Sequence, residues 1–313
     1  MLVSTKTGKP VAQVNEDRTT RLVIHGKGIA MRLREQFERA ANARGSTVRL
    51  PPGALHNDAF AINDVENTPR ARRNVETLVP HARVDAAFAH GWWDIGRVKI
   101  AMYDMDGTTI DDDCAANMRS LVPGAKEKEY ALRKERDERG LPTYDSGNKR
   151  KRTMLFKGLP EEAVKRRVEA FVERSNPGAE EMFNAFRPYA KQVIASGGFT
   201  HFTGALVERF GLDSHQAMQL EVRNGVLTGK IVGDTLGPRA KARWLSELSR
   251  SLPSGALRVA VGNGTNDIKM FQTARYLGGV AVAYHAHPHA EAAADIAVRH
   301  AGLDSIPNYF YRR

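Results

Sequence analysis

Four short apolar runs recur from residue 98 onward, and each is followed by a polar or glycine-rich turn and then by a helical pattern. The runs are KIAMY (99–103), QVIA (192–195), LRVAV (257–261) and GVAVAY (279–284). Continuous apolar strands that alternate with helices are typical of a parallel sheet covered by helices on both faces. We therefore predict an α/β fold whose core, over residues 98–313, is a Rossmann-like parallel sheet.

The first 97 residues follow a different pattern. TRLVIHG (20–26) reads as a strand, AMRLREQFERAANARG (30–45) has the apolar spacing of a helix, and residues 72–89 look mostly helical. This pattern predicts a small N-terminal α/β unit over residues 1–97, ahead of the core.

A long charged segment separates the first two strands of the core. Residues 114–188 are too many for a plain crossover, and PEEAVKRRVEAFVERS (160–175) within them reads as a helix that starts at a proline. We expect an inserted, mainly helical cap over about residues 114–188. Further along, LEVRNGVLTGKIVGD (220–234) predicts a hairpin with Asn224-Gly225 as its turn.

The composition is that of a globular protein, since 42% of the 313 residues are hydrophobic and 27% are charged. No apolar run approaches the length of a membrane span, and the N-terminus lacks the apolar stretch of a secretory signal. Cys114 is the only cysteine, which excludes an internal disulfide and fits a reducing compartment. We expect a cytoplasmic protein with no membrane partner.

The formal net charge of +11 raises the question of a nucleic-acid partner. The excess of Lys and Arg is spread over segments of mixed sign, and NKRKR (148–152) is the only tight cluster. Nucleic-acid-binding domains usually gather basic and aromatic residues on one face. We therefore do not expect a nucleic-acid partner. A mildly positive field that gathers small anions fits the charge equally well.

The first apolar run ends in DMDGT, where Asp104 and Asp106 lie just past a strand end and Gly107 lets the chain turn. Ligands of such sheets bind beyond the carboxyl ends of the strands, so both carboxylates can face a ligand. Asp104 can act as a nucleophile toward phosphorus and form an aspartyl phosphate. Asp106 can protonate the leaving oxygen and then activate a water. The charges of phosphate and carboxylates call for Mg²⁺ and a lysine.

Other polar clusters supply the remaining groups. SGGFT (196–200) offers the Ser196 hydroxyl and glycine N–H groups as a phosphate cradle at the start of a helix, which Ser196 can also cap. Lys241 lies in the helical segment PRAKARWLSEL (238–248), where it can reach the phosphate as a point charge. GNGTND (262–267) adds oxygen ligands or orienting groups, namely Asn263, Asn266 and Asp267.

The order of these four motifs is similar to that of the haloacid dehalogenase superfamily, and three stretches resemble its phosphoserine phosphatases. They are SGGFTHFTGAL, LEVRNGVLTGKIVGD and GVAVAYHAHPHAEAAADIAVRHAGL. The resemblance covers about residues 98–313. It implies a Mg²⁺-dependent phosphomonoester hydrolase for a small phosphorylated amino or hydroxy acid, with O-phosphoserine as the first candidate. Related enzymes often carry a regulatory or dimerising module where this chain has residues 1–97, so a homodimer is one expectation.

The resemblance also implies roles for residues around the phosphoryl group. Asp104 would be the nucleophile and a metal ligand. Asp106 would be the general acid and base, with its main-chain oxygen on the metal. Ser196, Gly197 and Lys241 would hold the phosphoryl group.

Five more residues would hold the metal and the rest of the substrate. Asn263 stands where the family has its third metal ligand, and Asp267 lies behind it as a further metal residue. Asn266 belongs to the substrate-binding set. Asp113, nine residues after the nucleophile, would bind the substrate ammonium, and Arg152 would bind its carboxylate.

Three positions depart from the family pattern, and one assignment depends on register. Asn263 replaces an aspartate, which removes a negative charge and predicts weaker Mg²⁺ binding. Asp113 is one methylene shorter than the family's glutamate, and Gly107 replaces a serine. A shift of two positions would replace Arg152 by Arg150. The departures leave alternatives open: another phosphorylated metabolite, a phosphoryl acceptor other than water, or a non-catalytic binding or regulatory protein on a degraded phosphatase scaffold.

Some conspicuous residues favour structural roles. The histidines of HAHPHA (285–290) could suggest a metal site, but the family's similar loop makes incidental histidines the better interpretation. Trp92-Trp93 is expected to pack between the N-terminal unit and the core. Cys114 is expected to be a small buried apolar residue.

Overall fold

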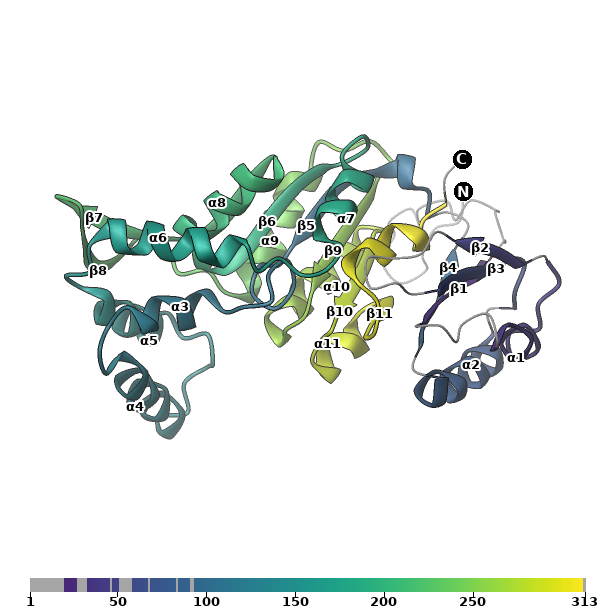
Figure 1. Cartoon of the computed structure of the whole chain (residues 1–313), viewed down its shortest axis with the longest axis horizontal. Helices are drawn as coiled ribbons and strands as arrows, with labels where there is room; N and C mark the ends of the chain where they lie inside the picture. Colours follow the sequence, from purple (N-terminus) through teal and green to yellow (C-terminus); the bar gives the residue numbers. More distant parts are fainter. Residues whose placement is uncertain are drawn as a thin grey trace, which may run out of the picture.

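The computed structural model describes residues 20–26, 33–45, 47–50, 58–66, 68–82, 84–90 and 93–311. Two sheets organise this part of the chain, one of seven strands and one of four (Figure 1). The N-terminal stretch before Thr20, the start of the helix predicted from residue 30, and Trp92 lie outside the described residues. None of the described helices has the length and apolar character that a membrane crossing needs.

The seven-stranded sheet confirms the predicted parallel core. Its order is β11-β10-β9-β5-β6-β7-β8, and only β7 and β8 pair antiparallel, as the predicted hairpin. β5 is the central strand. The strands are β5 (Val98–Tyr103), β6 (Lys191–Phe199), β7 (Ser214–Arg223), β8 (Val226–Val232), β9 (Leu257–Gly262), β10 (Val280–Tyr284) and β11 (Ile296–Val298).

Alternate side chains of the core strands face two different helix layers. Ile100 and Met102 pack with α9 (Pro238–Ser249) and α10 (Ile268–Tyr276), whereas Ala101 and Tyr103 face the other layer. Because successive side chains of a strand point to opposite faces, both sets must be apolar, which is why these strands read as continuous apolar runs. The second layer contains α6 (Glu161–Val172), α7 (Ala179–Phe186), α8 (Thr200–Phe210) and the 3₁₀ helix η5 (Leu303–Tyr309).

The N-terminal residues form the predicted α/β unit, an antiparallel sheet of order β2-β3-β1-β4 with both helices on one face. The elements are β1 (Thr20–Gly26), α1 (Arg34–Ala40), β2 (Thr47–Leu50), β3 (Asp58–Ile62), α2 (Pro69–Ala82) and β4 (Val84–His90). The mostly helical prediction for residues 72–89 is wrong at its end. There VDAAFAH forms a strand, because it pairs with β1 along its whole length and is largely buried.

Buried polar contacts join this unit to the core. Asp85 on β4 is fully buried and accepts the main-chain N–H groups of residues 299–301 at 2.7–2.9 Å. Arg21 on β1 donates to the main-chain oxygens of Asn308 and Phe310 at 2.6 and 2.7 Å. The β1–β4 side of the small sheet is therefore tied to the C-terminal segment of the core.

The insert between β5 and β6 is mainly helical, as predicted. Three of its helices, α3, α4 and α5, lie together at one end of the molecule (Figure 1). α6 instead packs on α8 and α7 on η5, so these two belong to a layer of the core. The β7–β8 hairpin contacts α5 and η3. The remaining bounds are α3 (Cys114–Ser120), α4 (Ala125–Glu138), α5 (Ser146–Thr153) and the 3₁₀ helix η3 (Met154–Phe156).

His25 on β1 should make the stability of the protein depend on pH. The residue is 1% exposed, its ring lies 5.4 Å from that of Tyr309, and neither ring nitrogen has a hydrogen-bond partner among the described residues. Burial lowers the pKa of His25 from 6.5 to about 4. As the pH falls below 6.5, the unfolded chain therefore binds a proton that the folded chain does not. The free energy of unfolding should decrease by about 2 kcal/mol from this group between pH 7 and pH 5.

Urea denaturation at both pH values measures this decrease. In His25→Leu, the free energy of unfolding should decrease by about 2 kcal/mol less between pH 7 and pH 5 than it does in the unaltered protein. His289→Leu, an exposed position on α11 (Pro288–Ala293), should behave like the unaltered protein. An identical decrease in His25→Leu and in the unaltered protein would contradict the assignment.

Candidate active site

The chain turns directly after β5, and this places Asp104 at the C-terminal edge of the sheet. The N–H of Asp104 donates to the main-chain oxygen of Val261 at 2.9 Å, and its own main-chain oxygen accepts the Thr109 hydroxyl at 2.7 Å. Its carboxylate Oδ1 accepts the Met105 N–H at 2.8 Å. The side chain of Asp104 is only 5% exposed. These contacts hold the carboxylate in one orientation.

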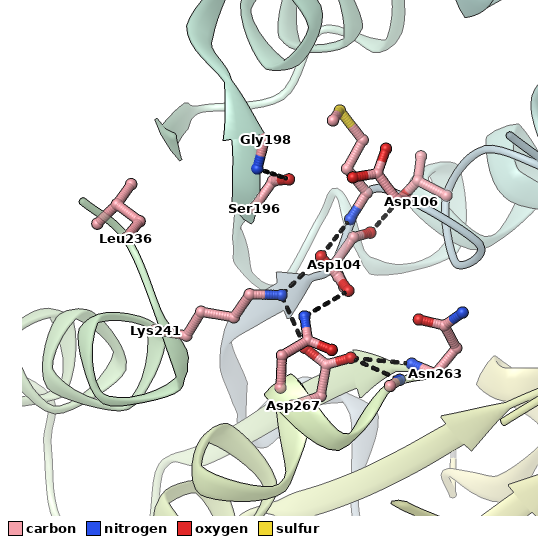
Figure 2. Close-up of polar contacts among 12 residues, drawn as sticks. Asp104, Asp106, Ser196, Gly198, Leu236, Lys241, Asn263 and Asp267 are labelled. Atoms are coloured by element: carbon pink, nitrogen blue, oxygen red, sulfur yellow. Dashed lines mark hydrogen bonds and ion pairs between the residues drawn. The ribbon is translucent and has the colours of Figure 1, made fainter. Parts of the chain in front are cut away.

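Lys241 on α9 bridges two buried carboxylates (Figure 2). Its Nζ lies 2.6 Å from Asp104 Oδ1 and 2.7 Å from Asp267 Oδ1. Burial acts to lower the pKa of Lys241, but the two carboxylates outweigh it and raise the pKa above its ordinary value. Lys241 therefore stays charged beside Asp104.

Both oxygens of Asp267 have partners. Oδ1 binds Lys241, and Oδ2 accepts the N–H groups of Asn263 at 3.0 Å and Gly264 at 2.9 Å. Asp267 is also fully buried. This arrangement favours a role in holding Lys241 and the GNGTND turn over the metal role predicted from the sequence.

Asp106 lies next to Asp104 in the same turn (Figure 2). Its Oδ1 accepts the N–H of Cys114 at 2.8 Å. Burial, followed by the charges of Asp104 and Asp113, raises the pKa of Asp106 to about 8. A carboxyl group with this pKa is largely protonated at neutral pH and can donate its proton.

Two asparagines flank this turn. Gly107 has a φ of +70°, and a Cβ atom there would come within 2.2 Å of Asn263 Nδ2. The Asn263 amide therefore packs against the turn at Asp106, which gives a steric reason for glycine where the resembling enzymes have serine. The amide of Asn266 donates to Asp104 Oδ2 over a long 3.4 Å.

The SGG segment belongs to β6 and not to the following helix. β6 runs to Phe199 and α8 begins at Thr200, so Ser196 does not cap α8. Ser196 is buried, and its Oγ accepts the Gly198 N–H at 2.9 Å (Figure 2). A Cβ atom at Gly198 would come within 2.3 Å of Cys114 Sγ, so glycine is required for the close approach of α3.

A cavity of about 320 Å³ lies between these strand ends and the helices α3, α4 and α5. The predicted residues in its wall are Asp106, Asp113, Arg152, Gly197 and Asn266. Other wall residues could not be singled out from the sequence, because α4 and α5 are charged along much of their length and no local signal shows which charges face inward. These residues include Glu129, Arg133, Arg136, Tyr144 and Lys149.

Arg152 is already paired in this wall. It forms an ion pair with the buried Glu129, which also binds Arg119 at 2.7 Å and Arg133 at 2.6 Å. Burial acts to raise the pKa of Glu129, but the three arginines outweigh it and lower the pKa. Arg150 points elsewhere and donates to main-chain oxygens of the β7–β8 hairpin. Of these two arginines, only Arg152 lines the cavity.

Asp113 and Lys149 enter the wall from α3 and α5. The Asp113 carboxylate caps α3 by accepting the N–H of Ala116 at 2.6 Å. The Lys149 ammonium donates to the main-chain oxygen of Leu236. Burial and neighbouring cations lower the pKa of Lys149 to about 8.

The oxygen atoms around Asp104 are of the hard type that Mg²⁺ prefers. The candidate ligands at this turn are the Asp104 carboxylate, the main-chain oxygen of Asp106 and the amide oxygen of Asn263, which would lie 3.7 Å from a Cβ atom on Gly107, farther than the amide nitrogen. No group of three or more His, Cys, Asp or Glu side chains in the described ranges is arranged to hold a metal. A cation here would therefore depend on amide and main-chain oxygens as well as on carboxylate, and the donor set fits Mg²⁺.

Other residues that stand out in the sequence occupy structural positions. Trp93 is buried, and its ring lies 5.1 Å from that of His90 and 6.3 Å from that of Phe310. It therefore packs where the N-terminal unit meets the core. Cys114 is fully buried, as expected for an apolar role. His285 lies 3.2 Å from a main-chain oxygen, through its Nε2.

The fold and the site together define a phosphatase with carboxylates at the C-terminal edge of a parallel sheet. The chain belongs to the haloacid dehalogenase-like hydrolases, since the model of that family matches residues 101–272.

Individual relatives agree with this membership. A phosphoserine phosphatase of Albidiferax ferrireducens is 33% identical over 222 residues, which cover 68% of this chain and 89% of that protein. The crystal structure of a probable phosphoserine phosphatase from Vibrio cholerae aligns with a TM-score of 0.75 and 27% identity over 96% of this chain and 88% of that one. A phospho-aspartyl intermediate analogue of a phosphoserine phosphatase aligns with a TM-score of 0.57 and 29% identity, covering 68% and 99%. These similarities confirm the family resemblance and the fold predicted from the sequence.

Proposed function

We propose that this phosphatase is a Mg²⁺-dependent phosphomonoester hydrolase that acts through an aspartyl-phosphate intermediate. Its substrate is a small phosphorylated amino or hydroxy acid, with O-phosphoserine as the first candidate, in serine biosynthesis in the cytoplasm. Support comes from the relatives called phosphoserine phosphatases and from the structural neighbour described as a phospho-aspartyl intermediate analogue.

The position of the Asp104 carboxylate carries this proposal. Its Oδ1 is bound by Lys241 and by the Met105 N–H, whereas its Oδ2 has only the 3.4 Å contact with Asn266 among the described residues. Oδ2 is therefore the oxygen available for attack. Asp106, whose raised pKa keeps it protonated at neutral pH, lies in the same turn.

These two residues would carry out the proton and phosphoryl transfers. Asp104 Oδ2 forms a bond to phosphorus while the bond from phosphorus to the ester oxygen breaks, and Asp106 gives its proton to that oxygen. Water then attacks phosphorus, Asp106 takes a proton from it, and the bond between Asp104 and phosphorus breaks. Inorganic phosphate leaves, and both carboxyl groups return to their starting states.

The other site residues would stabilise charge. Asp104, the main-chain oxygen of Asp106 and Asn263 would hold Mg²⁺, which when bound neutralises charge on the phosphoryl oxygens. Lys241, together with the Ser196 hydroxyl and the N–H of Gly197, would bind the phosphoryl group, and Asn266 would contact the substrate. Asp267 would keep Lys241 in place.

We extend the proposal to the organisation of the chain. Residues 1–97 would form a regulatory or dimerising unit, through which a homodimer could form, and residues 98–313 the catalytic unit. Of the insert predicted as a cap at about 114–188, α3, α4 and α5 would form the cap, because α6 and α7 pack in a helix layer of the core. The separate sheet and the separate apolar cluster of the first unit support this division.

Three alternatives retain specific support. The cavity wall, in which Asp113 also caps a helix, permits another phosphorylated metabolite, and transfer to an acceptor other than water would use the same intermediate. Asn263, in place of a charged ligand, supports a non-catalytic binding or regulatory protein on the same scaffold.

A hydrolysis screen over phosphorylated metabolites, with and without Mg²⁺, tests the proposal. We expect phosphate release from O-phosphoserine, or from a related phosphorylated acid, only when Mg²⁺ is present. Candidate alcohols added to the same assay would reveal transfer to another acceptor as a change in product partition.

Asn263→Asp should lower the Mg²⁺ concentration that gives half-maximal activity by about 10-fold, because the new carboxylate adds a charged ligand. Asn184→Asp, at an exposed position on α7, should leave this concentration unchanged. Mg²⁺ titration of the hydrolysis rate measures both. If neither the unaltered protein nor Asn263→Asp hydrolyses any phosphomonoester at high Mg²⁺, the proposal fails and the non-catalytic alternative gains.

A further inference from the structure

The charged residues of the cavity wall leave an excess of positive charge that the proposed chemistry does not use. Four basic side chains face three acidic ones. The basic residues are Arg133, Arg136, Lys149 and Arg152, and the acidic residues are Asp106, Asp113 and Glu129. A substrate therefore meets an electropositive wall in addition to the Lys241 centre.

Most of these cations are already compensated by carboxylates. Arg152 and Arg133 both bind Glu129, which is 4% exposed and also pairs with Arg119. Arg136 pairs with the aspartate that follows it in α4, at 2.6 Å. A substrate carboxylate at Arg152 would compete with, or lie close to, the buried charge of Glu129.

Lys149 differs from these arginines because no described carboxylate pairs with it. Its Nζ donates to the main-chain oxygen of Leu236 and lies 5.8 Å from the centre of the Tyr144 ring. A Cβ atom built on Gly197 would lie 3.5 Å from this Nζ. The ammonium is therefore beside the glycine that follows Ser196, at the edge of the predicted phosphate cradle.

We propose that Lys149 is a specificity-determining residue that binds a second acidic group of the substrate, next to its phosphoryl group. This inference rests on the proposed function and narrows it to phosphate monoesters of carboxylic acids. Under this proposal the substrate carboxylate binds mainly to Lys149, whose charge no described carboxylate compensates. It does not bind mainly to Arg152, whose charge Glu129 already compensates. A charge-assisted hydrogen bond to a partly buried ammonium is among the stronger contacts available to a carboxylate.

Binding of phosphonates, which lack a hydrolysable ester bond, tests this proposal by isothermal titration calorimetry with Mg²⁺ present. One probe is the phosphonate analogue of O-phosphoserine, and the other is propylphosphonate, which has no carboxylate. Lys149→Met should weaken binding of the carboxylated probe by about 10- to 100-fold and leave propylphosphonate within about 2-fold. Lys149→Gln, as a second variant, should do the same.

Lys151→Met is the matched control, because Lys151 lies on the same helix, is exposed and pairs with Glu135 at 2.7 Å. It should bind both probes as the unaltered protein does. Circular dichroism of each variant checks that it is folded.

Several outcomes would overturn the proposal. An equal loss for both probes would mean that Lys149 holds the phosphoryl group, and a selective loss in Arg152→Met but not in Lys149→Met would return the carboxylate to Arg152. If the unaltered protein binds both probes equally well, or binds neither, the proposed acid subsite does not exist. The experiments distinguish failure of this proposal from failure of the proposed function. If the protein binds the carboxylated probe selectively but hydrolyses nothing in the metabolite screen, the acid subsite stands and the hydrolase function is rejected.

Discussion

Replacement of Asp104 by asparagine should reduce kcat for any phosphomonoester by on the order of 10⁴-fold or more. A neutral amide oxygen is a far weaker nucleophile than the carboxylate Oδ2, so the aspartyl phosphate cannot form at a useful rate. Asparagine is nearly isosteric with aspartate, and the main-chain bonds to Val261 and Thr109 do not involve the side chain. Lys241 also keeps its ion pair with Asp267 in this variant. The loss of activity should therefore be chemical, with the far-UV circular dichroism unchanged.

Asp111→Asn is the control for this prediction, because Asp111 is exposed and lies in the same loop. It should hydrolyse substrate at the rate of the unaltered protein. Mass spectrometry of protein quenched during turnover should find a phosphoryl group on the peptide that contains Asp104. Unchanged hydrolysis by Asp104→Asn would rule out this residue as the nucleophile.

Lys241→Met should reduce both activity and stability. The substitution leaves Asp104 and Asp267 buried without the ammonium that now lies 2.6 and 2.7 Å from them. Removing one partner of a buried ion pair costs about 3–5 kcal/mol, so the free energy of unfolding at pH 7 should fall by about that amount. The loss of a fixed positive charge at the phosphoryl position should also lower kcat/KM by at least about 10²-fold.

Steady-state kinetics and urea denaturation separate these two effects. Arg243→Met, at an exposed position on the same helix, should change neither. Adding Asp267→Asn to Lys241→Met should restore part of the stability, because one unpaired carboxylate disappears, but none of the activity. If Lys241→Met is as stable as the unaltered protein, the buried charges are not coupled in the way that the distances indicate.

Burial explains which elements could be predicted. The core strands are covered on both faces, so their apolar runs are visible in the sequence, and the parallel arrangement brings their polar ends to one edge. Asp104, Asp106, Lys241 and Asn263 meet there although they come from distant parts of the chain (Figure 2). β4 shows the opposite case, since its alanine-rich sequence suits a helix and only pairing with β1 makes it a strand.

Taken alone, the sequence determined the parallel core, the helical insert and the identity of the polar residues that follow the strands. The partners of these residues depend on tertiary contacts. Both oxygens of Asp267 are bound by Lys241 and by main-chain N–H groups, Glu129 binds Arg152, and Lys149 faces the cavity while Lys151 faces solvent. The physical reason is the distance along the chain over which each kind of signal acts. Apolar periodicity and turn residues act over a few positions, whereas an ion pair or a cavity wall depends on which side chains from distant segments come within a few ångströms of each other.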